Sequence, residues 1–258
     1  MPRATSGRRC SPGRNCPPAT SVLLQALRLL ALFAVLAPGA WYAWQWRGMP
    51  HASEYHDDGV YFVGAKGMAE SGRYAIESLP AEPMQTKYPP LWPATLSLAW
   101  RATPHYPENL PLAMLLCWIW LPVSLVLLHA WWRSAGLSTD LALGLCVVWA
   151  LNPYVVLFSS AMLSEMQFTC LLVGTLLCFR REGVWWAVLA GVLAGLTFLS
   201  RTAGIALFPV GVAVYLLRSN PLRAGAFGGA MLPAVLGWML WAGAVASSRS
   251  MSLSTASC

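Results

Sequence analysis

The sequence predicts an all-α membrane protein: a polytopic bundle of about seven transmembrane helices, with a long first extracytoplasmic loop that contains interfacial helices. Two features of its composition predict this class, because 57% of the 258 residues are hydrophobic and only 10% are charged. Soluble domains carry roughly 25% charged residues, so this chain lacks the polar surface that a soluble fold of its size needs. Composition therefore argues against a soluble enzyme, a disordered chain and a small disulfide-rich secreted protein.

The chain begins with a basic segment and a first apolar run. Residues 1–20 are rich in arginine, proline and serine and contain no acidic residue, and we expect a disordered cytoplasmic tail. The run that follows, at about residues 22–46, ends in a cluster of tryptophans and a tyrosine. A signal peptide has an apolar stretch of only ~7–15 residues, whereas this run is longer and ends in side chains typical of a membrane interface. We interpret it as a retained first span.

Residues 47–110 interrupt the apolar pattern and hold seven of the ten acidic residues. We name this segment the acidic loop. Its apolar stretch at residues 91–100 is too short to cross a bilayer core of ~30 Å as a helix. We therefore expect an interfacial or re-entrant segment there and a catalytic loop over residues 47–110 as a whole.

Six further apolar runs complete the predicted bundle, at about residues 110–131, 141–159, 161–179, 184–200, 203–217 and 227–246. Together with the first run they form one transmembrane domain over residues 21–246. Two glycine pairs with four-residue spacing, Gly191 with Gly195 and Gly225 with Gly229, predict close packing of helix backbones. The Ser-rich residues 247–258 carry no structural signal, and we expect a disordered tail at a truncated end.

The positions of the arginines predict the orientation in the membrane. The net charge of +7 comes from arginines scattered between apolar runs, which does not predict a nucleic-acid-binding face. If the N-terminus is cytoplasmic, the short loops with Arg133, Arg180–Arg181 and Arg218 are all cytoplasmic, as the positive-inside rule requires. The acidic loop, Glu165 and Arg201 then lie on the extracytoplasmic side. We expect a bacterial inner (plasma) membrane protein with a periplasmic or extracellular site.

The densest group of ionisable residues is the run HASEYHDDGVYF, which begins at His51. Asp57 and Asp58 precede a helical pattern, and a helix N-terminus favours carboxylates. An alternative is that Asp57 only caps this helix. A metal site built from His51, His56 and an acidic residue is a further alternative, although the spacing fits no specific template.

Three other polar positions lie on the same predicted side. The run TKYPPLWP places Lys87 and Tyr88 before two prolines that keep the chain extended. Glu165 begins an apolar span, and Arg201 lies between two spans. Lys87 and Arg201 have an alternative interpretation as anchors to lipid phosphates. Taken together, a carboxylate base and nearby cations suit transfer of a group from a lipid phosphate to an acceptor hydroxyl.

Four segments in order, DDGVYFVGAKGMAESGRY, KYPPLWPATLSLAW, LSEMQF and AGLTFLSRTAGIALFP, resemble the membrane glycosyltransferases of the GT-C type. The resemblance is greatest to the protein O-mannosyltransferase and lipid-A aminoarabinose transferase group, and it covers about residues 22–246. Its most specific elements are the acidic pair with the Tyr61 that follows, and the Tyr-Pro-Pro-Leu run that begins at Tyr88.

The resemblance implies an inverting transfer from a polyprenyl- or dolichyl-phosphate sugar at the extracytoplasmic face. It implies that Asp57 is the general base with Asp58 as its partner, and that Lys87 binds phosphate. It further implies that Glu165 binds the acceptor or a metal and that Arg201 lies near the donor phosphate. Tyr61 and Tyr88 are expected to contact substrate.

The sequence leaves three questions open: which cofactor is used, which acceptor is used, and whether the chain is a whole enzyme or a portion of one. Some members of the group use a divalent metal ion and others do not; here the metal candidates are Asp58, His56 and Glu165. The partners expected are the lipid-linked sugar donor, the membrane, and a lipid, glycan or protein acceptor, with no nucleic acid. Members of the group are about twice as long, so we expect an N-terminal portion. The alternative functions are a transporter or flippase of lipid-linked sugars, and a non-catalytic truncated membrane protein.

Overall fold

The computed structural model describes residues 19–49 and 54–255. Within these ranges the chain is helical, and its only β-type pairing is an isolated bridge between Ala75 and Met84. The all-α prediction is confirmed. His51 and residues 1–18 of the predicted basic tail lie outside the described residues.

The helices follow one another with short connections except in the acidic loop. They are α1 Ala19–Gln45, α2 Asp57–Glu70, α3 Leu91–Ala102, α4 Leu110–Trp118, α5 Trp120–Ser134, α6 Thr139–Ala150, α7 Pro153–Ser160, α8 Glu165–Phe179, α9 Val184–Ser200, the 3₁₀ helix η1 Thr202–Ala206, α10 Leu207–Leu217 and α11 Pro221–Thr255. The expected run 184–200 matches α9. Helix α11 continues through Thr255, so residues 247–255, which we expected in a disordered tail, are helical.

Within the described residues, two helices are long and apolar enough to cross a membrane, Leu110–Ser134 and Pro221–Ser247. Helices α6 and α7 provide a third span if the pair is counted together, but they meet at a bend of 63°. The run at residues 141–159, which we expected to form one span, is therefore divided into two helices. Pro153 begins a new helix, and the Asn152 side chain caps it by accepting the Tyr154 N–H at 2.9 Å.

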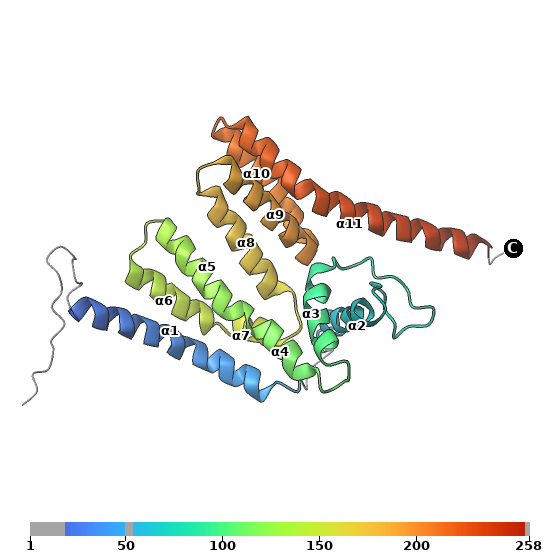
Figure 1. The fold of residues 1–258 in the computed structure, drawn as a ribbon, viewed down its shortest axis with the longest axis horizontal. Helices are drawn as coiled ribbons and strands as arrows, with labels where there is room; N and C mark the ends of the chain where they lie inside the picture. Colours follow the sequence, from blue (N-terminus) through green and yellow to red (C-terminus); the bar gives the residue numbers. More distant parts are fainter. Residues whose placement is uncertain (1–18, 50–53, 256–258) are drawn as a thin grey trace, which may run out of the picture.

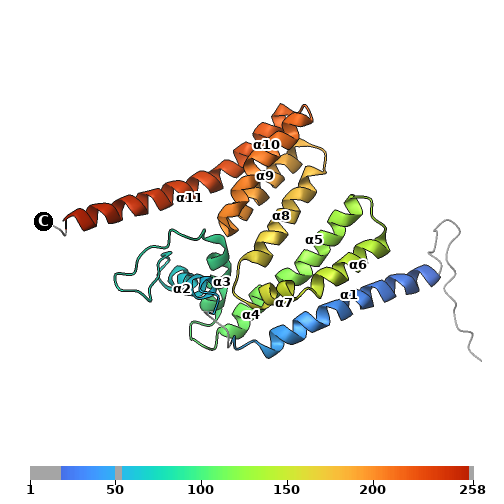
Figure 2. The same ribbon diagram turned by 180° about the vertical axis from the view of Figure 1, so that it is seen from behind.

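Helices α5, α6, α8, α9 and α10 lie beside one another, and the helices of the acidic loop, α2 and α3, lie at one end of them (Figures 1 and 2). The C-terminal part of α11 extends past the rest of the bundle. Its N-terminal part packs against α9 and α10. This arrangement brings the acidic loop to the end of the bundle where α8 begins and α9 finishes.

The arginine-bearing loops meet at the opposite end of the bundle (Figure 1), which we name the arginine end. Its contacts are hydrogen bonds and ion pairs: Arg180 to the Ser134 carbonyl, Arg218 to the Phe179 carbonyl, Arg223 with Glu182, and Arg28 with Asp140. The separation of these arginines from α2 and α3 agrees with the alternation of loops that the sequence predicted.

Close packing between α9 and α11 depends on one of the two predicted glycine pairs. A Cβ atom on Gly191 would lie 2.3 Å from the Phe227 carbonyl oxygen, and one on Gly195 would lie 2.9 Å from the Ala234 Cβ. Gly225 and Gly229 have no such neighbour within 4 Å, so the prediction was wrong for that pair. Only the first pair is required for the helices to approach.

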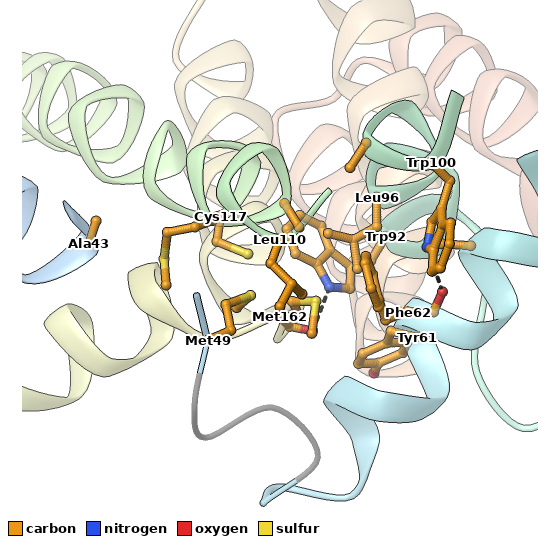
Figure 3. Packing of buried hydrophobic residues seen from close by; sticks show 14 residues of the cluster. Ala43, Met49, Tyr61, Phe62, Trp92, Leu96, Trp100, Leu110, Cys117 and Met162 are labelled. Carbon is orange, nitrogen blue, oxygen red and sulfur yellow. Dashed lines mark hydrogen bonds between the residues drawn. The ribbon is translucent and has the colours of Figure 1, made fainter. Parts of the chain in front are cut away.

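A buried cluster holds α2 and α3 against α4 (Figure 3). Trp92 on α3 is fully buried and donates its indole N–H to the Met162 carbonyl at 2.9 Å. Trp100, on the same helix, donates its indole N–H to the Phe62 carbonyl of α2 at 3.1 Å. Because both indole donors are paired, two large aromatic side chains can be buried here without loss of hydrogen bonding. The cluster fixes α2 beside the segment that leads into α8.

Candidate active site

Asp57 is the first residue of α2, and its carboxylate accepts a hydrogen bond from the Tyr88 hydroxyl. The residue that precedes the helix is His56, which has a left-handed φ of 56° and makes no side-chain cap. The alternative that Asp57 is only a helix cap is therefore wrong. Its carboxylate interacts across the acidic loop with a residue of the Tyr-Pro-Pro-Leu run.

Asp58 lies in different surroundings from Asp57. Its side chain is 1% exposed, its carboxylate accepts the Gly59 N–H at 2.8 Å, and it lies within electrostatic range of Cys117 in α4. Adjacent helix positions point in different directions, so the two carboxylates do not share one environment. Asp57 faces Tyr88, and Asp58 faces the buried side of α2.

Tyr61, one helical turn after Asp57, joins α2 to the start of α8. Its ring meets the Tyr88 ring edge-on, with 5.0 Å between the centroids. Its hydroxyl lies 3.5 Å from the Ser164 Oγ, in the residue before Glu165. Tyr88 and Tyr61 therefore connect Asp57, the predicted base, with the start of α8, where Glu165 lies.

Glu165 and Arg201 form an ion pair, although 36 residues separate them. Glu165 begins α8, and Arg201 follows the last residue of α9, so the packing of these two helices brings the charges together. Glu165 Oε2 is buried and has no hydrogen-bond partner. A cavity of about 410 Å³ lies beside the pair, with Asn152 and Phe158 of the bent α6–α7 segment in its wall.

Lys87 is exposed, and its Nζ lies 4.6 Å from the centroid of the Tyr88 ring. Contact with the Tyr88 hydroxyl is the main cause that raises the pKa of Lys87, and Asp57 adds to it. The ammonium group is therefore charged beside the carboxylate. We name Asp57, Tyr61, Lys87, Tyr88, Ser164, Glu165 and Arg201 the polar cluster.

The tyrosines of the polar cluster keep their protons. Burial is the largest cause that raises the pKa of Tyr88, and its hydrogen bond to Asp57 raises it further. Burial also raises the pKa of Tyr61, with Asp57 and Glu165 acting in the same direction. Both side chains therefore stay neutral at physiological pH, and Tyr88 donates its hydroxyl proton to the Asp57 carboxylate.

The structure adds two groups that the sequence analysis did not select. Tyr74 donates its hydroxyl to the Tyr88 carbonyl at 3.1 Å. Gln167 donates to the Thr95 hydroxyl at 2.8 Å and accepts from Ser200 at 3.2 Å, which ties α3, α8 and α9 together beside Arg201. An isolated glutamine in an apolar helix is a detectable signal, because polar side chains there form interhelical hydrogen bonds. Nothing in the sequence marks Tyr74.

The metal candidates do not form one group. Asp58 is buried against α4, His56 is exposed, and Glu165 pairs with Arg201. Among the described residues no three His, Cys, Asp or Glu side chains gather closely enough to hold a metal ion. His51 of the alternative metal site lies outside the described residues, and we derive no step through a metal.

Comparison of the chain with protein-family models, with curated proteins and with solved structures returns no match.

Proposed function

We propose that this protein is a membrane glycosyltransferase that moves a sugar from a polyprenyl- or dolichyl-phosphate donor to an acceptor hydroxyl. The observation that carries the proposal is the set of contacts around Tyr88 and Tyr61: Tyr88 contacts both Asp57 and Lys87, and Tyr61, whose ring meets that of Tyr88, lies within electrostatic range of Arg201. A carboxylate base beside two cations is what this reaction needs.

In the proposed mechanism Asp57 removes the proton from the acceptor hydroxyl. The acceptor oxygen attacks the anomeric carbon as the bond from that carbon to the phosphate oxygen breaks, and the configuration inverts. The electron pair leaves with the phosphate, whose charge Lys87 and Arg201 stabilise. Tyr88 orients the Asp57 carboxylate through its hydrogen bond, and Glu165 holds Arg201.

The proposed topology follows from the two ends of the bundle. We propose seven spans, the arginine end in the cytoplasm, and the polar cluster at the periplasmic or extracellular face of a bacterial plasma membrane. The separation of the arginine end from the acidic loop supports this orientation under the positive-inside rule. A lipid-linked donor would then meet the site at the membrane surface.

The test measures which sugar donor the purified protein consumes after reconstitution into liposomes. We expect consumption of a radiolabelled polyprenyl-phosphate sugar and none of a nucleotide sugar. Cysteine-accessibility labelling at residues 78 and 105 tests the orientation, and we expect both to react with a membrane-impermeant reagent added outside right-side-out cells. Consumption of the nucleotide sugar alone, or labelling only after permeabilisation, contradicts the proposal.

A further inference from the structure

A chain of side-chain hydrogen bonds crosses the helix bundle beside the polar cluster. The Ser200 hydroxyl donates to the Gln167 amide oxygen at 3.2 Å, and the Gln167 amide nitrogen donates to the Thr95 hydroxyl at 2.8 Å. The Thr95 hydroxyl in turn donates to the Leu91 carbonyl at 3.1 Å. We name Thr95, Gln167 and Ser200 the Gln167 bridge. It joins α9 to α3 through α8.

The direction of the hydrogen bonds in the Gln167 bridge is fixed. The Thr95 hydroxyl gives its single hydrogen to the Leu91 carbonyl, so toward Gln167 it can only accept. Gln167 therefore turns its amide nitrogen to Thr95 and its amide oxygen to Ser200. Gln167 is 3% exposed and Ser200 is 1% exposed, so water does not compete for these bonds. The amide is held in one orientation.

Both ends of the Gln167 bridge lie close in the chain to residues of the polar cluster. Ser200 is the last residue of α9 and directly precedes Arg201. At the other end, Leu91 begins α3 three residues after Tyr88, and the two residues between them are prolines. Because proline has a fixed φ, this connection is stiff. The bridge therefore relates the position of Arg201 to that of Tyr88.

The other contacts of Arg201 hold it to helices α8 and α9. Its guanidinium pairs with Glu165, which begins α8, and its backbone N–H donates to the Thr197 carbonyl of α9 at 3.0 Å. Lys87, the second cation of the proposed phosphate site, lies instead in the acidic loop beside Tyr88. The Gln167 bridge connects these two parts of the molecule, since Thr95 belongs to the acidic loop.

We propose that Gln167 is a positioning residue, which through the Gln167 bridge holds Arg201 at the distance from Lys87 at which both cations contact one donor phosphate. The inference rests on the proposed function, and Gln167 acts in it through Arg201. Two cations bind one phosphate best when both are in place beforehand, because ordering a charged side chain on binding costs affinity. A bond that only holds helices together would instead change stability, and interhelical hydrogen bonds in membrane proteins change it modestly.

Two helical threonines provide a matched pair of variants. Thr95 on α3 and Thr175 on α8 each donate to the carbonyl four residues earlier, at 3.1 Å and 2.9 Å. Thr95 also accepts the Gln167 amide, whereas Thr175 lies outside the bridge. Thr95→Val therefore breaks the bridge, and Thr175→Val makes the same chemical change without breaking it. Thr95→Ser keeps the hydroxyl and serves as the conservative variant.

The experiment measures steady-state kinetics of each purified variant in liposomes that contain a radiolabelled polyprenyl-phosphate sugar and host membrane lipid. We expect Gln167→Met and Thr95→Val to raise KM for the donor about fivefold and to change kcat less than about twofold. Thr95→Ser and Thr175→Val are expected to keep the KM of the wild type. In an Arg201→Gln background, Gln167→Met is expected to raise KM no further, because the residue through which it acts is gone.

Three results would overturn the inference. They are an unchanged KM in both Gln167→Met and Thr95→Val, an equal rise of KM in Thr175→Val, and a further fivefold rise when Gln167→Met is added to Arg201→Gln. If Gln167→Met does not fold, Thr95→Val and the same double variant with Arg201→Gln decide the question. No donor consumption by the wild type instead overturns the proposed function, and this inference with it.

Discussion

The Tyr88 hydroxyl donates a hydrogen bond to the Asp57 carboxylate, although 31 residues of the acidic loop separate the two. The bond joins the start of α2 to the Tyr-Pro-Pro-Leu run and holds the carboxylate toward Tyr88. A general base must be held in one orientation to take a proton efficiently.

Tyr88→Phe removes this bond and leaves the aromatic contact with Tyr61. We expect the rate of sugar transfer to fall about tenfold with little change in KM for the donor, because a hydrogen bond to a charged group is lost. Tyr106→Phe is the control, since Tyr106 is 64% exposed and lies outside the polar cluster. Steady-state kinetics check the expectation, and an equal loss in both variants would contradict it.

Arg201→Gln removes the cation of the Glu165–Arg201 ion pair. Glu165 loses its partner, and the proposed phosphate site loses a cation, so we expect KM for the donor to rise about 10- to 100-fold. Arg101→Gln changes an exposed arginine of α3 and serves as the control. An unchanged KM in Arg201→Gln would remove this residue from the donor site.

Gly191→Ala tests the contact between α9 and α11. Because the added Cβ would lie 2.3 Å from the Phe227 carbonyl oxygen, the helices must move apart. We expect a loss of ~1–3 kcal/mol of stability, or roughly 5 °C in Tm, in detergent. Gly225→Ala has no neighbour within 4 Å, and we expect its Tm to equal or exceed that of the wild type. Equal losses in the two variants would contradict the packing described.

Tyr74 makes stability depend on pH in the alkaline range. Burial is the largest cause that raises its pKa above the ordinary value of 10.0. Above that value the unfolded chain has lost the tyrosine proton and the folded protein has kept it, so stability is full at lower pH and falls as pH rises. We expect the wild type to lose more stability than Tyr74→Phe between about pH 9 and pH 11, measured by thermal unfolding. An equal loss of stability with pH in the wild type and in Tyr74→Phe would contradict this expectation.

The sequence was sufficient for those parts of the fold that depend on local composition. The boundaries of α9, the all-α class and the position of the arginine end opposite the acidic loop follow from apolar runs and loop charges. The bend at Pro153 was missed because an apolar run looks the same whether its helix is straight or broken. The choice of the Gly191 pair over the Gly225 pair was missed because nearly uniform apolar helices do not reveal which face meets a neighbour.

The candidate site, like the fold, was predicted from the sequence only in part. Asp57, Lys87, Glu165 and Arg201 were selected as single residues because charged groups are costly near a membrane. Their partners were not predictable, since Asp57 and Tyr88 lie 31 residues apart, Glu165 and Arg201 lie 36 residues apart, and each pair meets only through tertiary packing. Tyr74 was missed for a related reason, because its hydroxyl bonds a main-chain carbonyl that no sequence pattern specifies.

The most direct test of the proposed reaction is transfer by Asp57→Asn in liposomes supplied with a radiolabelled polyprenyl-phosphate sugar and host membrane lipid. Asparagine keeps the shape of the side chain and cannot take the acceptor proton. Glu54→Gln, an exposed change three residues earlier, controls for charge. We predict that Asp57→Asn abolishes transfer while its expression and Tm match those of Glu54→Gln, which stays active. Undiminished turnover by Asp57→Asn would contradict the assignment of the base.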